Sequence, residues 1–301
     1  EGPWEACMTM GAAWQYQPQN EIYKPGRELI RLLIQTRAKG GNLLLDVGPK
    51  PNGELPIEQE ERLREIALWM FVNSDAIYGV RPWVITNEGD VWFTKKKDED
   101  TLYAIVDSAQ PWKLGEWKDF TLHSVKATAK TEISVLGQNG EVLEYQPKVT
   151  PRTTFRMESD GLHIHSIRAQ RLQDNHQWPN PVVIKMTHVE AAFVPPHVKT
   201  TGSILEPAGH GYVLQGDLLD MGGAASLEVG FEYRAIDGED VQARTTPWVP
   251  LEMQTVTRPG VFSAKIENLP THGLYEFRAV VRHPLLSLYG ADMTMGRSAP
   301  R

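Results

Sequence analysis

Near the start of the chain, apolar residues follow two patterns: a continuous run that is typical of a buried strand, and spacings of three and four that are typical of helices. Residues 43–47, LLLDV, form a nearly continuous apolar run beside a glycine pair, a pattern typical of a parallel strand buried on both faces. Apolar residues within 27–34 predict a helix before this run, and spacings of three and four predict another at 58–73. With a strand at 1–7, the order strand, helix, strand, helix predicts parallel βαβ packing, as in a doubly wound sheet or a (β/α)8 barrel.

Two polar loops follow the predicted strands. Residues 11–26 are rich in glycine, proline, glutamine and asparagine, and residues 48–55 contain two prolines and two glycines. In a barrel, the loops that leave the carboxyl ends of the strands build the active-site face. We therefore expect Trp14 and Tyr16 on that face, and Trp4 inside the barrel.

From residue 82 onward the pattern changes to short strands separated by turn residues, which predicts an antiparallel β-sandwich. The predicted strands are 83–86, 91–94, 102–106, 120–125, 132–136, 153–157, 162–165 and 182–187.

Pro195 and Pro196 mark a stiff linker, after which further strands are predicted. They are 212–218, 226–235, 260–269 and 274–282. The leucine–proline turn at 269–270 and the YEFRA sequence at 275–279 resemble the fibronectin type III pattern. The chain is thus predicted to have three domains, 1–81, 82–194 and 195–301.

Composition excludes several classes of function. The 301 residues carry a net charge of −7, which argues against a nucleic-acid partner. No apolar run reaches the roughly 18 residues of a membrane span. Cys7 is the single cysteine, so no intrachain disulfide can form. Cysteine usage therefore does not distinguish a reducing from an oxidising compartment.

Several separated motifs carry a resemblance to a known family. They are WEACMT at 4–9, the aromatic pair that follows, KGGNLLLDVGP at 39–49, ERLREI at 61–66 and AIYG at 76–79. In this order they resemble glycoside hydrolase family 29, the α-L-fucosidases, closely over residues 4–82. The resemblance implies an α/β plus all-β fold: the C-terminal portion of a (β/α)8-type barrel, an antiparallel β-sandwich and a second, fibronectin type III-like sandwich.

The resemblance also implies an activity. Family members are retaining enzymes that hydrolyse terminal α-L-fucosyl linkages, so the expected partner is a fucosylated glycan, without a cofactor or metal. The expected location is secreted or periplasmic, and a homo-oligomer is left open. Because family members carry most barrel strands before the WEACMT motif, we expect this chain to be the C-terminal part of a longer enzyme, inactive alone and with exposed strand edges.

Retaining glycosidases need two carboxyl groups about 5 Å apart, one as nucleophile and one as general acid/base. The resemblance places the nucleophile, an aspartate, on an earlier strand that is not in this chain. It places the acid/base either upstream or at Glu5. The alternative for Glu5 is a supporting carboxylate held near the strand end.

Trp14 aligns with the aromatic residue that family members place against the fucose ring and its methyl group. A 6-deoxy sugar has an apolar edge, which an aromatic ring suits. The alternative is a core tryptophan under a long loop. Trp4 and Tyr16 are further candidates for substrate binding, although a structural role is favoured for Tyr16.

Two substitutions depart from the family pattern. Gln15 stands where a glycine is frequent, and Asp46 where asparagine is common; a buried Asp46 would need a partner. They support an alternative function, a non-catalytic carbohydrate-binding or scaffold protein with a degenerate barrel. His163 and His165 alternate on a predicted strand as a metal pair might, but without a third ligand at a familiar spacing the pattern favours a surface pair.

Overall fold

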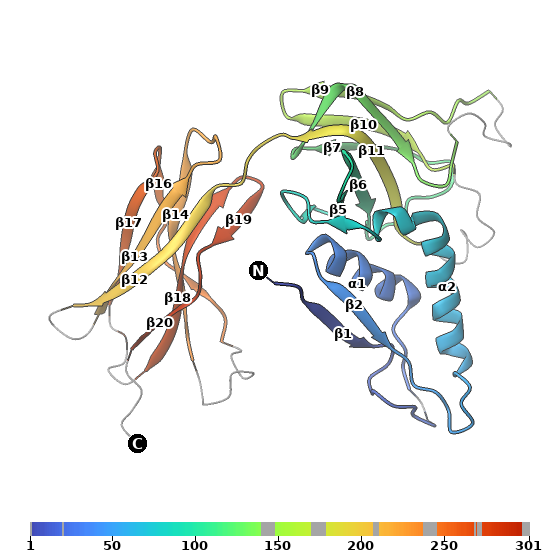
Figure 1. Cartoon of the computed structure of the whole chain (residues 1–301), viewed down its shortest axis with the longest axis horizontal. Helices are drawn as coiled ribbons and strands as arrows, with labels where there is room; N and C mark the ends of the chain where they lie inside the picture. The colour runs from blue at the N-terminus through green and yellow to red at the C-terminus, as the bar shows by residue number, and fades with distance from the viewer. Residues whose placement is uncertain are drawn as a thin grey trace. The chain divides into compact units, whose positions relative to one another are not determined.

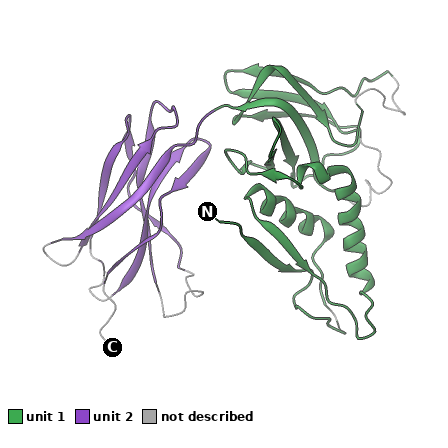
Figure 2. Cartoon of the chain, viewed as in Figure 1, with its two compact units in different colours: residues 1–192 green, residues 193–301 purple. Residues whose placement is uncertain are grey.

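The computed structural model describes residues 2–19, 21–139, 148–169, 179–206, 211–236, 246–267, 269 and 273–296. The chain divides into two compact units, residues 1–192 and 193–301 (Figure 2). None of the described helices has the length and apolar character needed to cross a lipid bilayer.

Unit 1 begins with the order strand, helix, strand, helix: β1 (Glu5–Thr9), α1 (Gly26–Ala38), β2 (Asn42–Asp46) and α2 (Ile57–Asn73) (Figure 1). β1 and β2 pair in parallel, from Glu5 opposite Asn42 to Thr9 opposite Asp46, so the predicted parallel packing is confirmed. The residue before each helix is a proline, whose fixed φ suits a helix start. α1 ends at Ala38, and two residues later Gly40 has a φ of 85°, which favours glycine.

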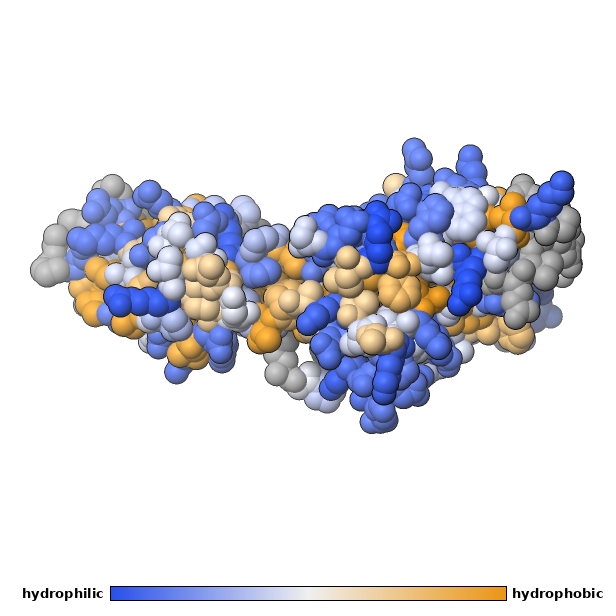
Figure 3. Space-filling view, turned by 90° about the horizontal axis from the view of Figure 1, so that it is seen from above, coloured by the Kyte–Doolittle hydropathy of each residue, from blue (hydrophilic) through white to orange (hydrophobic). Residues whose placement is uncertain are grey.

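The expectation that the strand at 43–47 is buried on both faces is wrong. β1 and β2 form a two-stranded sheet in which every residue is exposed or half-buried. α1 packs against β2 on one side, while Cys7 and Leu44, which are paired in the sheet, are exposed. Leu44 is 50% exposed and Met8 38%. Figure 3 likewise shows hydrophobic residues reaching the surface in several groups.

The rest of unit 1 is antiparallel. A six-stranded sheet contains β3 (Val80–Arg81), β4 (Asn87–Glu88), β5 (Val91–Lys96), β6 (Thr101–Val106), β11 (Val182–Ala191) and β8 (Val125–Val135). A three-stranded sheet has the order β7 (Trp117–Leu122), β10 (Gly161–Ile167), β9 (Thr154–Glu158). A short 3-10 helix, η1 (Ser74–Ala76), precedes β3.

Two strand predictions in this region are wrong. Residues 83–86 form no strand, and the short β4 follows them instead. The segment 120–125 is the end of β7, a turn and the start of β8, because residues 123–124 reverse the chain between the two strands. Apolar residues on both sides of that turn made it look continuous.

One hydrophobic core of unit 1 lies between the helices and the six-stranded sheet. Its buried residues come from α1, α2, η1, β3, β6 and β11: Ile30, Ile34, Trp69, Ala76, Ile77, Val80, Tyr103, Ile105 and Val183. The Trp69 indole also donates a hydrogen bond of 2.8 Å to the carbonyl of Pro181. This core crosses the boundary predicted between residues 81 and 82, and the structure accordingly groups both sides into one unit.

Unit 2 contains two antiparallel sheets. One has the order β12 (His197–Leu205), β13 (Gly211–Asp220), β17 (Gly260–Glu267). The other contains β15 (Val249–Pro250), β14 (Leu227–Ala235), β18 (Leu274–His283), β19 (Leu286–Tyr289), β16 (Gln254–Val256) and β20 (Met293–Gly296). Both sheets contribute to one hydrophobic core, with Leu214 and Phe262 from the first and Phe231 and Phe277 from the second. Pro270 of the predicted leucine–proline turn lies outside the described residues.

An ion-pair cluster joins α1 to the end of β6. The Asp107 side chain is 2% exposed, and its carboxylate lies 2.5 Å from Arg31 Nε and 3.3 Å from Arg27 Nη2. Arg27 also donates a hydrogen bond to the carbonyl of Ser108. The hydrogen bond to Asp107 raises the pKa of Arg31. A buried carboxylate without such partners would be strongly unfavourable.

We predict that Asp107→Ala lowers the free energy of unfolding by about 2 kcal/mol. The expected loss is below the value for fully buried pairs because both arginines are partly solvated and can rehydrate. Urea denaturation measures this difference, with the exposed Asp98→Ala as the matched control. Equal stability of the two variants would contradict a structural role for the cluster.

A second buried carboxylate connects α2 with the segment before β11. Glu65 is 5% exposed, and Asn180 Nδ2 donates a hydrogen bond of 2.9 Å to its Oε1. Gly26, at the start of α1, packs against the carboxylate, where a Cβ atom would overlap Glu65 Oε2. Burial raises the pKa of Glu65, opposed in part by the hydrogen bond from Asn180.

This raised pKa gives a pH dependence of known sign. The protonated carboxyl is favoured in the folded state, so its contribution is complete below the ordinary carboxyl pKa and is lost as the pH rises through the raised value. We predict that Glu65→Gln gains stability relative to wild type between pH 4 and pH 7, by about 1.4 kcal/mol for each unit of the pKa shift. Denaturation at both pH values measures it, and the exposed Glu60→Gln serves as control. The prediction is contradicted if the stability of Glu65→Gln, measured relative to wild type, is lower at pH 7 than at pH 4.

Candidate active-site edge

The carboxyl ends of β1 and β2 lie side by side and release the two predicted loops. Thr9 and Asp46 are paired at these ends, and the Met10 amide donates a hydrogen bond of 3.4 Å to the carbonyl of Asp46. Lys24 Nζ donates to the carbonyls of Thr9, at 2.7 Å, and Gly11, at 3.1 Å. One lysine thus fastens the far end of the first loop to its beginning.

The two loops touch through a glycine. A Cβ atom at Gly48 would lie 2.8 Å from the backbone nitrogen of Tyr16 and 3.0 Å from the carbonyl carbon of Gln15, so a larger residue would push the loops apart. The Gly48 amide donates a hydrogen bond of 3.0 Å to Gln59 Oε1, and the Gln59 side chain is buried in α2. The VGP motif draws attention to Gly48 in the sequence. Neither its contact with the first loop nor its hydrogen bond with Gln59 was predicted.

A tyrosine missed by the sequence analysis connects the first loop to α2. The Tyr23 side chain is hydrogen-bonded to those of Gln59 and Glu21, and burial is the largest cause of its raised pKa. Glu21 Oε1 in turn accepts a hydrogen bond of 3.4 Å from the Ala13 amide, beside Trp14. A single tyrosine in a polar loop gives no recognisable pattern in the sequence.

Trp14 is 57% exposed on the first loop. It therefore does not pack as a core residue in this structure, and its indole is open to solvent near the edge where the sequence predicted it. Tyr16 is half-buried, with its backbone against Gly48. The two aromatic residues thus differ, since Trp14 offers a free apolar surface and Tyr16 contributes to the contact between loops.

Trp4 and Glu5 lie at the opposite end of β1. Glu5 is the exposed first residue of the strand, and at about 3.3 Å per residue it is about 13 Å from Thr9. Trp4 is 40% exposed rather than enclosed, and its ring covers Gly41, where a Cβ atom would lie 2.5 Å from the ring. The structure therefore does not bring Glu5 to the carboxyl end of its strand, and the catalytic role of Glu5 and the binding role of Trp4 stay predictions.

Asp46 is half-buried at the end of β2, rather than fully buried as the sequence suggested. Two surface cavities lie at other elements of unit 1. One, of about 790 Å³, is lined by β8 and residues 150–155, and the other, of about 480 Å³, by Trp83, Lys95 and residues 189–191. Trp14, Tyr16 and Glu5 line neither cavity.

Comparison with known proteins finds similarity to one family in the first part of the chain. Residues 1–75 match the family model described as alpha-L-fucosidase. A plasma alpha-L-fucosidase of Rattus norvegicus is 36% identical over 140 residues, which are 44% of this chain and 30% of the relative. An alpha-L-fucosidase of Dictyostelium discoideum is 36% identical over 141 residues, covering 46% of this chain and 30% of the relative.

Solved structures give weaker likenesses. Alpha-L-fucosidase isoenzyme 1 from Paenibacillus thiaminolyticus is 25% identical, with a TM-score of 0.45, covering 62% of this chain and 40% of that one. An alpha-L-fucosidase from Vibrio sp. strain EJY3 is 16% identical with a TM-score of 0.47, covering 89% of this chain and 50% of that one. The chain spans less than a third of the length of the two curated relatives. The resemblance predicted from the motifs is nevertheless confirmed, because residues 1–75 match the alpha-L-fucosidase family model and both curated relatives carry that name.

Proposed function

We propose that this chain forms part of a retaining α-L-fucosidase that hydrolyses terminal α-L-fucosyl linkages in glycans. The observation that carries the proposal is the position of Trp14, an exposed indole on the loop that follows β1, within the segment that matches the fucosidase family. Fucose lacks the 6-hydroxyl group, so one edge of the sugar is apolar. An exposed indole fixed by its loop can bind that edge.

The neighbouring residues support this role by restricting the loop. Lys24 holds its two ends together, and Gly48 allows the backbone at Gln15 and Tyr16 to pack against the second loop. Because the loop is fixed before substrate arrives, less conformational freedom is lost on binding. Gln15 replaces a frequent glycine without breaking this contact, since the close approach is made by the backbone of residues 15–16.

The open edges of the β1–β2 sheet support its place in a larger barrel. Among the described residues each of these strands pairs only with the other, and Cys7, Met8 and Leu44 are exposed. In a (β/α)8 barrel both edges would pair with further strands, and the uncovered face would be enclosed. We place the nucleophile, and the acid/base with it, on such strands, which leaves Glu5 a supporting carboxylate.

Export to the cell exterior or periplasm is part of the proposal, and the plasma location in the rat relative's name supports it. No specific observation favours the alternative, a non-catalytic carbohydrate-binding or scaffold protein.

We predict that Trp14→Ala, in the longest natural polypeptide that carries these residues, lowers kcat/KM for an aryl α-L-fucoside about tenfold, chiefly through KM. The reason is the loss of about 1.4 kcal/mol of contact with the sugar. Trp117→Ala is the matched control, because Trp117 is 37% exposed on the three-stranded sheet. Absence of fucoside hydrolysis in the wild type, or equal effects of the two variants, would overturn the assignment.

We predict that Glu5→Gln in the same polypeptide lowers kcat less than tenfold and leaves the shape of the pH profile unchanged. Removal of a general acid lowers rates by about 10²–10⁴-fold and abolishes one limb of that profile. Steady-state kinetics from pH 4 to pH 9 distinguish the two outcomes. A loss in the larger range, with the limb removed, would identify Glu5 as the proton donor.

A further inference from the structure

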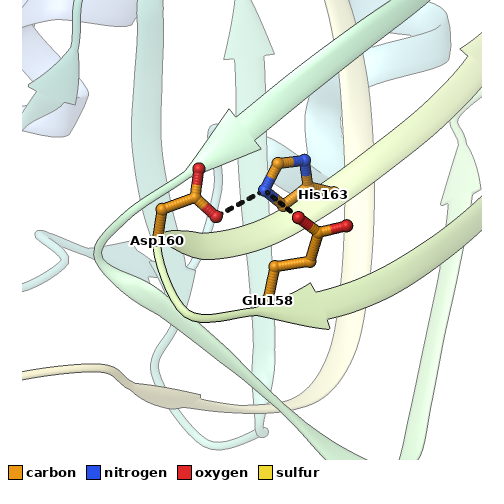
Figure 4. Close-up of side chains that lie close together, drawn as sticks. All are labelled: Glu158, Asp160 and His163. Carbon is orange, nitrogen blue, oxygen red and sulfur yellow. Dashed lines mark hydrogen bonds and ion pairs between the residues drawn. The ribbon is translucent and has the colours of Figure 1, made fainter.

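The hairpin of β9 and β10 brings three potential metal ligands together (Figure 4). Glu158 ends β9, Asp160 lies in the turn and His163 is in β10. His163 Nε2 lies 2.6 Å from Asp160 Oδ1 and 3.6 Å from Glu158 Oε2, and the three ligand atoms lie within 4.8 Å of one another. A histidine nitrogen thus lies close to two carboxylate oxygens from different residues.

The second ring nitrogen of His163 contacts the neighbouring strand. Thr121 of β7 is paired with His163 in the sheet, and its Oγ1 lies 3.4 Å from His163 Nδ1. When Nδ1 carries a proton and donates it to Thr121, the Nε2 lone pair faces the two carboxylates. In that tautomer the three acceptors repel one another unless a cation lies between them, whereas a proton on Nε2 gives the hydrogen bond to Asp160 in the absence of an ion. Metal-binding histidines commonly use their second nitrogen in this way.

The turn that carries Asp160 is also fixed. His123 Nδ1 lies 2.5 Å from the carbonyl oxygen of Asp160, which connects the turn to the end of β7. Gly161 has a φ of 144° and packs so closely that a Cβ atom would lie 2.6 Å from the carbonyl oxygen of Leu122. The position of Asp160 therefore follows from contacts outside the three ligands.

We propose that Glu158, Asp160 and His163 bind a divalent transition-metal ion such as Zn²⁺, with water completing its coordination. One imidazole and two carboxylates form a donor set that Zn²⁺ accepts. Tetrahedral ligands at the usual bond lengths lie about 3.3 Å apart. The distances of 2.6 and 3.6 Å fall on either side of this value, so small side-chain rotations suffice.

One residue opposes the ion. The Arg156 guanidinium pairs with Glu158 Oε1, on the opposite side of the carboxylate from His163. Its positive charge weakens the binding of a cation, and its side chain is 65% exposed. Arg156→Gln should therefore strengthen metal binding, a result that a purely structural ion pair would not produce.

The chain offers a matched control two residues away. His165 also pairs with a carboxylate, at 2.8 Å between its Nδ1 and Asp119 Oδ1, and its ring stacks on Trp117. Among the residues that the structure describes, no third ligand joins this pair in a metal-binding group. The two histidines that the sequence presents as equivalent thus differ in their surroundings.

The test is isothermal titration calorimetry of the full chain with ZnCl₂ in chelator-treated buffer. Wild type should bind one ion in a site that His163→Ala weakens at least about tenfold and that His165→Ala leaves unchanged. Glu158→Gln and Asp160→Asn, which preserve side-chain size, should each weaken the same site. Arg156→Gln should tighten it several-fold, and CaCl₂ should bind far more weakly, because calcium requires more oxygen ligands.

Three results would overturn the proposal: no saturable zinc site in the wild type, equal loss of zinc in the two histidine variants, or calcium binding as tight as zinc binding. Thermal melts in EDTA show whether each variant is folded. If His163→Ala melts early, the two carboxylate variants decide, and unchanged zinc binding in both would refute the site.

Discussion

The packing of α1 and α2 against an antiparallel sheet, through the apolar face of α1 and Trp69 of α2, is the constraint on which unit 1 depends. α1 has strand β2 on one side and the six-stranded sheet on another, and α2 contributes Trp69 to the same core. Burial of these apolar faces provides most of the driving force. The Asp107 cluster restricts how α1 lies against the end of β6. A shift of α1 would leave this buried carboxylate without its two arginines. The position of the β1–β2 sheet follows from that of α1.

This arrangement explains how loops without regular structure can present an ordered surface. The edge that carries Trp14 is fixed by the parallel register of β1 and β2, by Lys24 at the ends of the first loop, and by Gln59 of α2 beneath the second. Neither Lys24 nor Gln59 needs to contact a sugar. Their contribution is to hold the backbone so that one exposed indole has a defined place.

Much of this could be predicted from the sequence because the relevant signals are local. Helical spacing, the apolar run at 43–47 and the glycine pair beside it located the first four elements, and the family motifs located Trp14. Tertiary packing could not be inferred in this way. Leu44 has the same neighbours in sequence whether or not a further layer covers its strand, and the chain reversal at residues 123–124 lacks glycine or proline. Asp107, Glu65 and Asn180 became recognisable only when distant segments met. The group around His163 is different, because its carboxylate partners Glu158 and Asp160 are near it in the sequence. Only their orientation toward the imidazole could not be predicted.

The shared core between the helices and the antiparallel sheet also bears on how such proteins can evolve. A module that folds alone can be exchanged between genes by recombination, but Tyr103, Ile105 and Val183 are buried against Ile30 and Trp69. A crossover near residue 82 would join surfaces that had never adapted to one another. Recombination near residue 82 would therefore be expected to cost stability, whereas unit 2 has a hydrophobic core of its own.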